Sequence, residues 1–305
     1  MSYAFSNRLI AGAAEAEVLP PELARTPVPI SLIVTTYNWP EALDLVLRSV
    51  TRQTLMPDEV LVADDGSGEA TALLLASWSR RLPAPLHHLW QENKGYRLAR
   101  SRNRAIAAAR GEYVIMIDGD MVLDENFVLD HARAREPGRF VQGVRIPTDH
   151  NGAARLLRER STTVSPLMPG LRRRHKAVRA EWLSRCFSRN FVTLPRIKGC
   201  NQAYWRSDLI AVNGFEERMI GWGPEDKECA ARLLHSGVNG VELRFAALAT
   251  HLHHASRAPS GTNPNDALLA ATLSSGRTRC EIGVDQHLPE FARGIPDSAR
   301  PPWRL

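Results

Sequence analysis

The sequence predicts an α/β protein built on a doubly wound, mostly parallel β-sheet. Three observations lead to this prediction. Short, continuously apolar runs of strand length alternate with segments in which apolar residues recur every three or four positions. Polar clusters follow three of these runs directly, as expected where a ligand binds at the carboxyl edge of a parallel sheet. At 305 residues the chain is long enough for one large α/β domain, alone or with a smaller lobe.

The first half of the chain carries the alternation. Residues 1–28 contain several prolines and no clear period, so we expect an N-terminal arm that is extended or forms a short surface helix. Beyond it, continuous apolar residues predict buried strands, and helical spacing predicts helices packed on them. The expected strands are 30–35, 59–63, 86–90 and 113–117, and the expected helices are 41–53, 70–80 and 98–110, the last ended by Gly111.

The second half has weaker periodicity. Residues 155–190 are expected to be irregular or helical, and 199–205 to form a strand or a turn. The apolar residues in 243–250 predict a strand that leads into a cluster of histidines. Further helices are expected at 207–212, 225–236 and 266–274, with Pro224 near the first turn of the second.

Composition and cysteine spacing indicate an ordinary globular protein. Hydrophobic residues make up 44% of the chain and charged residues 24%, which is typical of soluble domains. No apolar run reaches the roughly 18–20 residues that span a bilayer, and the N-terminus lacks a secretion signal pattern. The four cysteines are widely spaced without a CxxC pair, which predicts reduced, buried thiols in a cytoplasmic protein.

The net charge of +6 is concentrated in one segment. Between Arg155 and Arg189, ten Lys and Arg stand against two acids, a local charge of +8 that leaves about −2 for the rest of the chain. Such a segment suits an anionic partner, whether nucleic acid, an acidic membrane surface or a phosphorylated glycan. A solvated, partly mobile surface is the plain alternative.

The most informative pattern is Asp118-Gly119-Asp120, which ends the apolar run 113–117. A buried strand has no reason to end on two carboxylates, because they repel each other and are costly to desolvate. A divalent cation such as Mn²⁺ or Mg²⁺ would neutralise them and keep open positions for phosphate. The pattern therefore predicts a site for a metal-bound nucleotide diphosphate, with an exposed turn as the alternative.

Two further polar clusters are expected at the same sheet edge. Tyr37-Asn38 follows the first predicted strand, and Asp64-Asp65 follows the second. Because the carboxyl ends of parallel strands meet at one edge, these clusters and the carboxylates after 113–117 are expected to form one site. Taken alone, the second cluster also fits an ordinary aspartate-rich turn.

Six motifs in order resemble the family 2 glycosyltransferases, which have the Rossmann-like nucleotide-diphospho-sugar transferase fold. The motifs are Thr35-Thr36-Tyr37-Asn38, Asp64-Asp65-Gly66-Ser67, Asn93-Lys94-Gly95, Arg102-Asn103, Asp118-Gly119-Asp120 and Gly221-Trp222-Gly223-Pro224-Glu225-Asp226. The last motif, which follows Asn213-Gly214-Phe215 and precedes the histidines, resembles the C-terminal part of galactosyltransferases and bacterial chondroitin polymerases. The resemblance covers about residues 30–255. It implies a nucleotide-sugar-binding half at 29–150, a basic insertion at 151–195, an acceptor and catalytic half at 196–262 and a tail at 263–305.

The resemblance also implies a UDP-sugar donor. In the family, an aspartate after the second strand accepts a hydrogen bond from the uracil ring N–H, and we assign this role to Asp65, with Asp64 as its neighbour. Lys94, Arg97 and Arg102 are expected to contact phosphate or the base edge, since cations near a helix start favour anions. The remaining residues expected at the nucleotide are Thr35, Thr36, Tyr37, Asn38, Asp118 and Gly119.

The metal ligands and the catalytic base follow from the same resemblance. Asp120 is expected to bind the metal directly, while Asp118 contacts ribose or metal-bound water. A histidine joins the metal: the run Ser256-Arg257…Asn263-Pro264 favours His254 by similarity to galactosyltransferases, whereas His251 closes the strand and is the alternative. Asp226 is the expected base, and Glu225 and Trp222 are expected to contact the acceptor or the donor sugar. The remaining substrate-binding residues are expected to be Gly221, Gly223 and Asn201.

These inferences predict a metal-dependent inverting glycosyltransferase that serves bacterial cell-surface polysaccharide or lipopolysaccharide synthesis. Its partners would be a nucleotide-sugar donor, a glycan or glycolipid acceptor and, through 155–190, an anionic membrane at the inner face of the cytoplasmic membrane; no nucleic acid is expected. A sugar nucleotidyltransferase would need a Gly-rich phosphate loop after the first strand, where Tyr37-Asn38-Trp39-Pro40 stands instead. A non-catalytic binding module would be expected to lose its base or metal ligands. GDP in place of UDP stays open, as do the donor sugar and the acceptor.

Overall fold

The computed structural model describes residues 28–191, 193–194, 197–255 and 263–303. The predicted arm at 1–28 lies outside this part of the chain, apart from Val28. The strands are β1 Ile30–Thr36, β2 Glu59–Asp64, β3 Leu86–Trp90, β4 Tyr113–Asp118, β5 Met121–Leu123, β6 Arg139–Gln142, β7 Val144–Pro147, β8 Arg189–Phe191, β9 Asn201–Trp205, β10 Asn239–Glu242 and β11 Leu248–His251. The helices are α1 Pro40–Val50, α2 Glu69–Ser79, α3 Leu98–Ala108, α4 Phe127–Ala134, α5 His150–Glu159, α6 Glu181–Phe187, α7 Arg206–Ala211, α8 Glu225–His235, α9 Asn265–Ser275 and α10 Leu288–Phe291, with 3₁₀ turns η1 Arg174–Ala177, η2 Val284–Gln286 and η3 Asp297–Ala299.

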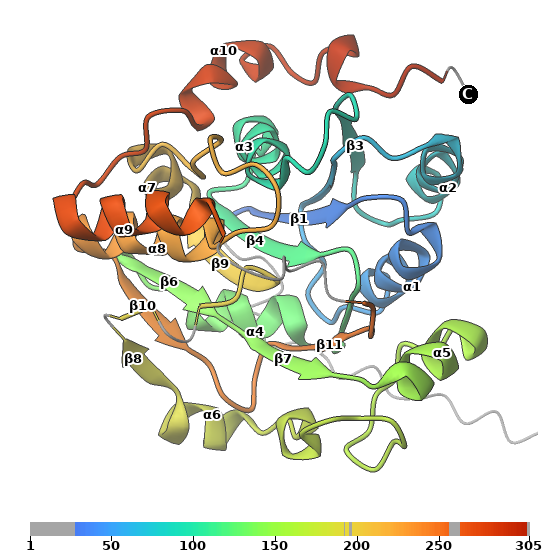
Figure 1. Cartoon of the computed structure of the whole chain (residues 1–305). Helices are drawn as coiled ribbons and strands as arrows, with labels where there is room; N and C mark the ends of the chain where they lie inside the picture. Colours follow the sequence, from blue (N-terminus) through green and yellow to red (C-terminus); the bar gives the residue numbers. More distant parts are fainter. Residues whose placement is uncertain (1–27, 192, 195–196, 256–262, 304–305) are drawn as a thin grey trace, which may run out of the picture.

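The larger sheet has the strand order β3-β2-β1-β4-β9-β6-β10-β8 (Figure 1). Strand β1 pairs in parallel with both β2 and β4, and β2 pairs in parallel with β3. Strand β9 runs antiparallel to its neighbours β4 and β6, and β8 runs antiparallel to β10. The predicted α/β fold with a mostly parallel sheet is therefore confirmed, with β9 as a reversed strand in its middle.

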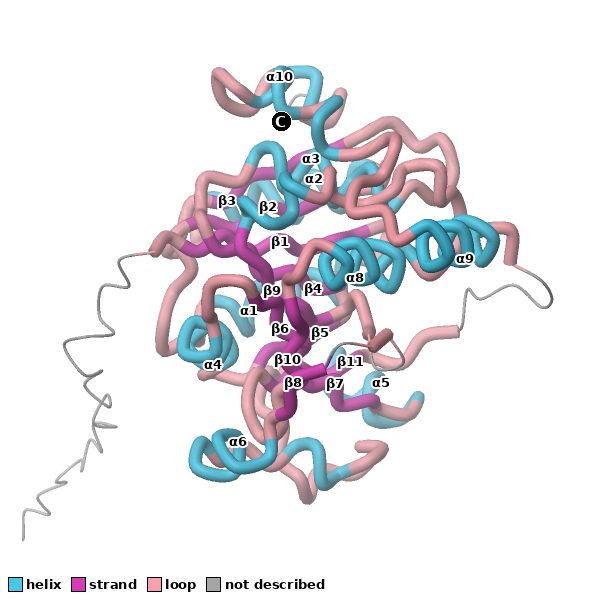
Figure 2. Tube along the Cα trace, turned by 90° about the vertical axis from the view of Figure 1, so that its left-hand side faces the viewer, coloured by secondary structure: helices cyan, strands magenta, loops and turns pink. Residues whose placement is uncertain are grey.

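Helices cover both faces of this sheet, which explains why its central strands are apolar without alternation. Leu32 and Val34 of β1 pack on one face with α1, α2 and α4, while Ile33 packs on the other face with α3 and α8. Figure 2 shows α4 and α8 on opposite sides of the strands. The sheet is thus doubly wound, and its carboxyl edge is left free of helices for the site.

A second sheet of three strands, in the order β5-β11-β7, brings distant segments together. Strand β11 pairs antiparallel with β5 and parallel with β7. Beyond β11, the Leu252 N–H donates to the carbonyl of Asp120 at 2.9 Å. This small sheet therefore carries the histidines at the end of β11 to the carboxylates at the end of β4.

Two sequence predictions of element ends are corrected by the structure. Helix α3 ends at Ala108, so Gly111 is not its cap; a Cβ at Gly111 would lie 2.5 Å from the backbone nitrogen of Ser31, and glycine is needed there for close packing on β1. Strand β11 begins at Leu248 and not at residue 243, because Phe245 and Ala247 adopt left-handed φ angles of 60° and 50° that no strand accommodates.

The basic segment is partly helical, as expected: it contains the second half of α5, then η1, α6 and the start of β8. Among the described residues, no helix is both long and apolar enough to cross a membrane. Cys200, Cys229 and Cys280 are buried free thiols, but Cys186 is exposed, so the prediction of buried thiols is wrong for that residue. It lies on α6, a short helix on the surface of the molecule (Figure 1).

Candidate active site

A cavity of about 530 Å³ opens where the carboxyl ends of β1, β4 and β11 meet. Asp65 lines it from the loop after β2, and Asp118 and Asp120 line it from the end of β4 and the turn that follows. The other predicted residues among those lining it are Thr35, Thr36, Tyr37, Gly119, Trp222, His251 and His254. The predicted convergence of polar clusters at one sheet edge is therefore present, and it unites residues from both halves of the chain.

Adjacent aspartates after β2 have different surroundings. Asp65 lines the cavity, where its carboxylate accepts the Gln91 side-chain N–H and the Arg97 backbone N–H, each at 2.6 Å. Burial raises the pKa of Asp65, and these two hydrogen bonds oppose the shift. Asp64 is fully buried and lies outside the cavity lining, because its oxygens bind the Ser67 backbone N–H and the ring of His88 at 2.8 Å. Only one of the pair can face a base.

Asn38, predicted at the nucleotide, instead holds the loop after β1 against the loop after β2. It has a left-handed φ of 49°, and its side-chain oxygen accepts the Gly68 backbone N–H at 2.8 Å. Its own backbone N–H donates to the Ser67 hydroxyl at 2.9 Å. Asn38 is not among the cavity-lining residues, and its hydrogen bonds hold the two loops together instead of facing the cavity.

Asp120, His251 and His254 form a group that fits a divalent metal. Their ligand atoms all lie within 4.8 Å of one another, and one Asp120 oxygen lies 3.1 Å from His254 Nε2 and 3.4 Å from His251 Nε2. The other Asp120 oxygen is buried without a hydrogen-bond partner among the described residues. Burial lowers the pKa of His251 to about 4, which keeps its imidazole neutral and able to bind a metal at neutral pH. One carboxylate and two imidazoles are a chemically suitable donor set.

The structure brings both candidate histidines to Asp120, so the sequence-based choice between them is unnecessary. The run 256–262, most of the stretch that favoured His254, lies outside the described residues. Asp118 is not part of this group: one of its oxygens accepts the Thr35 hydroxyl at 3.1 Å and the Arg102 guanidinium at 3.2 Å.

Arg102 joins the end of β4 to the start of α8 from inside the protein. Its buried guanidinium donates to Glu225 at 3.0 Å and to Asp118 at 3.2 Å. Burial raises the pKa of Glu225 to about 7, with Arg102 opposing the shift and Asp226 adding to it. Arg102 is not among the residues that line the cavity, and its guanidinium forms an internal ion pair with these two carboxylates.

Asp226 lies in the first turn of α8, partly exposed, with both oxygens bound to backbone N–H groups. One accepts from Gly199 at 2.6 Å and the other from Lys227 at 2.7 Å. Asp226 is not among the cavity-lining residues, whereas Trp222, four residues earlier, lines the cavity with 47% of its surface exposed.

Several predicted contacts have structural roles instead. Asn201 is fully buried and uses its amide on His131, Val144 and Ala247, where it ties the two sheets together. A Cβ at Gly223 would lie 2.5 Å from the Asn265 amide, so this glycine serves helix packing. Three further predicted residues, Lys94, Arg97 and Gly221, are not among the cavity-lining residues. Lys94 forms an ion pair with the exposed Glu92 at 2.8 Å, and Arg97 donates to the Glu92 carbonyl. The Gly221 N–H donates to the Tyr96 carbonyl.

Two arginines that line the cavity were not assigned to it from the sequence. Arg145, on β7, donates to His251 Nε2 at 3.0 Å. Arg172 lies in the basic segment, and the sequence indicated only that it contributes to the positive charge of that segment. The only sequence signal for Arg145 is its place between Val144 and Ile146, which alternate with it in burial on a strand of four residues.

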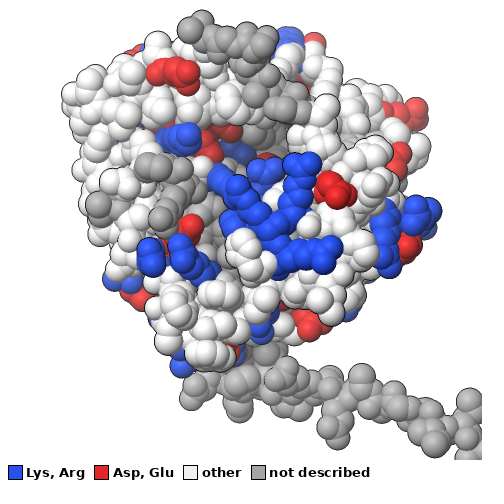
Figure 3. All heavy atoms as spheres, turned by 60° about the horizontal axis from the view of Figure 1, so that its bottom comes forward, with Lys and Arg blue, Asp and Glu red and all other residues white. Residues whose placement is uncertain are grey.

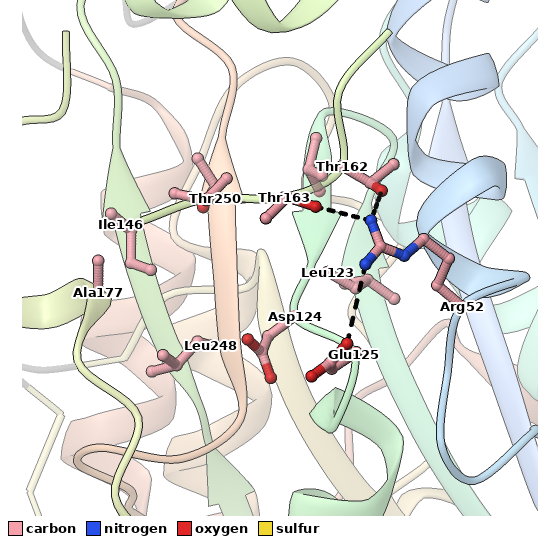
Figure 4. Close-up of a pocket in the computed structure, with 12 residues that line it drawn as sticks. Arg52, Leu123, Asp124, Glu125, Ile146, Thr162, Thr163, Ala177, Leu248 and Thr250 are labelled. Atoms are coloured by element: carbon pink, nitrogen blue, oxygen red, sulfur yellow. Dashed lines mark hydrogen bonds and ion pairs between the residues drawn. The ribbon is translucent and has the colours of Figure 1, made fainter. Parts of the chain in front are cut away.

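A smaller cavity of about 230 Å³ lies beside the three-stranded sheet (Figure 4). Arg52 reaches across one side of it and donates to the hydroxyls of Thr162 and Thr163 at 2.9 and 2.7 Å. Glu125 lies 3.8 Å from the same guanidinium. None of the predicted site residues lines this cavity, and its polar contacts fasten the loop after α5 to the end of α1.

Comparisons with known proteins agree with this geometry. A family model described as glycosyl transferase family 2 matches residues 31–207, and one described as the N-terminal domain of galactosyltransferase matches residues 190–255. Validoxylamine A glucosyltransferase of Streptomyces hygroscopicus subsp. limoneus is 29% identical over 244 residues, which cover 73% of this chain and 52% of that protein. Chondroitin synthase of Pasteurella multocida (strain Pm70) is 27% identical over 226 residues, 68% of this chain and 23% of that protein. The chain thus spans about half or less of the length of these relatives.

Solved structures share the fold. The crystal structure of S. aureus TarS 1-349 in complex with UDP matches with a TM-score of 0.56 and 17% identity, over 87% of this chain and 70% of that one. The mannosyltransferase PcManGT from Pyrobaculum calidifontis, in complex with GDP-Man and Mn²⁺, matches with a TM-score of 0.52 and 16% identity, over 86% and 72%. At these identities the likeness concerns the fold alone.

Proposed function

The chain belongs to glycosyl transferase family 2, and from that premise we propose that it transfers a sugar from a UDP-sugar, with a divalent metal, to a hydroxyl of a glycan or glycolipid. The observation that supports this most is the group of Asp120, His251 and His254 in the same cavity as Asp65. One end of the cavity thus has donors suited to a metal and the other a carboxylate suited to a base N–H. The relatives are bacterial, and we propose a cell-surface polysaccharide or lipopolysaccharide as the acceptor.

Each residue would have a distinct part in the reaction. Asp65 would accept the uracil N–H, and Asp120 with the two histidines would hold Mn²⁺ or Mg²⁺. A bound divalent cation supplies electrostatic stabilisation to a departing diphosphate. Asp226 would accept the proton of the acceptor hydroxyl while that oxygen attacks the anomeric carbon from the face opposite the diphosphate, which inverts the configuration.

The binding half of this proposal is tested by calorimetric titration with UDP, GDP, CMP and TDP, each with Mn²⁺ and with EDTA. We expect UDP to bind most tightly, and its affinity to fall at least tenfold in EDTA or in the Asp120→Ala variant, because the diphosphate loses its counter-charge. The TarS complex with UDP makes UDP the first choice, and the PcManGT complex with GDP-Man makes GDP the necessary comparison.

The outcomes separate the alternatives. Equal UDP affinity with Mn²⁺ and with EDTA would remove the metal from the proposal. Tighter binding of GDP would change the donor class. An absence of binding by every nucleotide would leave a protein that has kept the fold without the donor site.

We also propose that the basic segment contacts an anionic membrane. Figure 3 shows Lys and Arg side chains gathered on one face of the molecule. Within the same segment, Leu167 is 82% exposed, Trp182 69% and Phe187 45%. Exposed aromatic and aliphatic side chains next to arginines suit a membrane interface, where the charges meet lipid headgroups and the rings enter the boundary.

Vesicle co-sedimentation tests this contact. The wild-type protein is expected to bind vesicles of phosphatidylcholine with 30% phosphatidylglycerol and not pure phosphatidylcholine. Reversal of Arg172, Arg173 and Arg174 to Glu should remove most of the binding, because each basic residue near the surface contributes about 1 kcal/mol. Arg80→Glu, an exposed reversal at the end of α2, is the matched control. Binding that the triple reversal leaves unchanged would exclude the proposed contact.

A further inference from the structure

A second cavity, of about 250 Å³, adjoins the candidate active site, and four of its eleven lining residues are Lys or Arg. Arg145 lines both cavities, so they are neighbours. The other basic side chains of the second cavity are Lys176, Lys198 and Arg244, with His175 beside them. Glu242 is the single carboxylate among its lining residues. These residues come from β7, η1, the loop before β9 and the loop after β10, so folding gathers them from four separate segments.

Among the described residues that line this cavity, Glu242 is the one carboxylate that stands against four Lys and Arg side chains. Within the described part of the chain, no carboxylate lies within ion-pair distance of Arg145, Lys176, Lys198 or Arg244. The Arg145 Nε is buried and lacks a hydrogen-bond partner among the described residues. Burial lowers the pKa of Lys176, the charges of Lys198, Arg173 and Arg244 lower it further, and the charge of Glu242 opposes the shift. Gathering like charges in a cavity costs free energy, which a bound anion would offset.

The cavity also lies next to the proposed chemistry. The backbone N–H of Gly199 binds the candidate base Asp226 at 2.6 Å, and Lys198 is the preceding residue. The Lys198 backbone N–H is itself fixed by Gln142 at 2.9 Å. On the other side, Arg145 touches His251 of the metal group at 3.0 Å. An acceptor whose hydroxyl lies at Asp226 can therefore extend a neighbouring group towards Lys198.

We propose that this cationic cavity is an acceptor subsite for an anionic substituent, a phosphate or a carboxylate, carried by a sugar adjacent to the one that is glycosylated. The inference rests on the proposed transferase function and adds the chemical class of the acceptor. Guanidinium and ammonium groups at one wall suit an oxyanion better than a neutral sugar, because each hydrogen bond to it is charge-assisted.

The test is calorimetric titration of the full chain, saturated with UDP and Mn²⁺, with glucose 6-phosphate, glucuronate and glucose. We expect at least one of the two anionic sugars to bind at least tenfold more tightly than glucose, and the comparison between them separates phosphate from carboxylate. Lys198→Gln and Arg244→Gln should each weaken that binding about tenfold, as loss of one charge-assisted hydrogen bond does. Arg158→Gln, an exposed change on α5 outside the cavity, should have no effect.

The controls separate this inference from the function it rests on. UDP affinity is measured first in every variant, and a thermal melt checks that each is folded. If UDP binds but glucose binds as well as both anionic sugars, or if neither cavity variant weakens the anion, the anionic subsite is overturned and the transferase proposal stands. If UDP affinity falls in the cavity variants, the cations serve the donor and the acceptor subsite is equally overturned. Failure of UDP to bind the wild-type protein defeats the proposed function itself.

Discussion

Replacing Asp226 by Asn is expected to lower kcat for UDP release by about 10²–10⁴-fold, the usual contribution of a general base, while UDP affinity stays within about twofold. The amide oxygen can still accept the Gly199 N–H that now binds the carboxylate at 2.6 Å, so the loop should keep its place. What the variant loses is the capacity to take a proton from the acceptor hydroxyl. The measurement is steady-state UDP release with the donor sugar selected by calorimetry.

A matched control is available on another helix. Asp266 lies exposed in the first turn of α9, as Asp226 lies in the first turn of α8, but Asp266 has no part in the proposed reaction. Asp266→Asn should leave kcat unchanged. A kcat for Asp226→Asn equal to that of this control would remove Asp226 from the mechanism and direct attention to Glu225, whose pKa of about 7 also suits proton transfer.

Replacing Arg102 by Met is expected to lower the free energy of unfolding by about 3–5 kcal/mol at pH 8, because it leaves the buried Glu225 and the partly exposed Asp118 without their shared cation. The measurement is urea denaturation with the m-value compared. Arg110→Met, an exposed substitution shortly after α3, should change stability by less than about 0.5 kcal/mol.

The loss of stability in Arg102→Met is expected to depend on pH. Burial holds the pKa values of Asp118 and Glu225 above those of the unfolded chain, so the native state binds more protons than the unfolded state where the pH lies between the two values. Loss of Arg102 raises both native pKa values further. Stability of the variant should therefore recover, relative to wild type, as the pH falls from 8 through about 7 towards 5.5. A deficit that stays constant across this range would show that the carboxylates are not its cause.

The first half of the fold could be predicted because β1, β2 and β4 are buried on both faces and so appear as unbroken apolar runs. The segment between β4 and α5 could not. Strands of three or four residues, such as β5 and β7, are too short to show a period, and what defines them is pairing with β11, from the other end of the chain. The reversed direction of β9 likewise depends on its neighbours and not on its own residues.

The candidate site could be predicted at the level of segments, but side-chain direction decided which members face the cavity. Asp64 and Asp65 are adjacent, and the strand's geometry turns one inward to His88 and the other to the cavity. Arg102 has the positive charge expected of a residue that binds phosphate, but helix α3 places its side chain in the protein interior. The place of Arg145 between Val144 and Ile146 did not indicate the site, because its position next to His251 exists only once β7 pairs with β11.

The three-stranded sheet also determines at what point during synthesis of the chain the metal-binding group can form. Asp120 leaves the ribosome long before His251 and His254, and only the pairing of β11 with β5 brings them together. A nascent chain that has folded its first four parallel strands would hold Asp65 and Asp120 but lack the imidazoles. Metal capture would thus be postponed until the C-terminal third has been synthesised, since domains build long-range contacts only after the intervening chain is available.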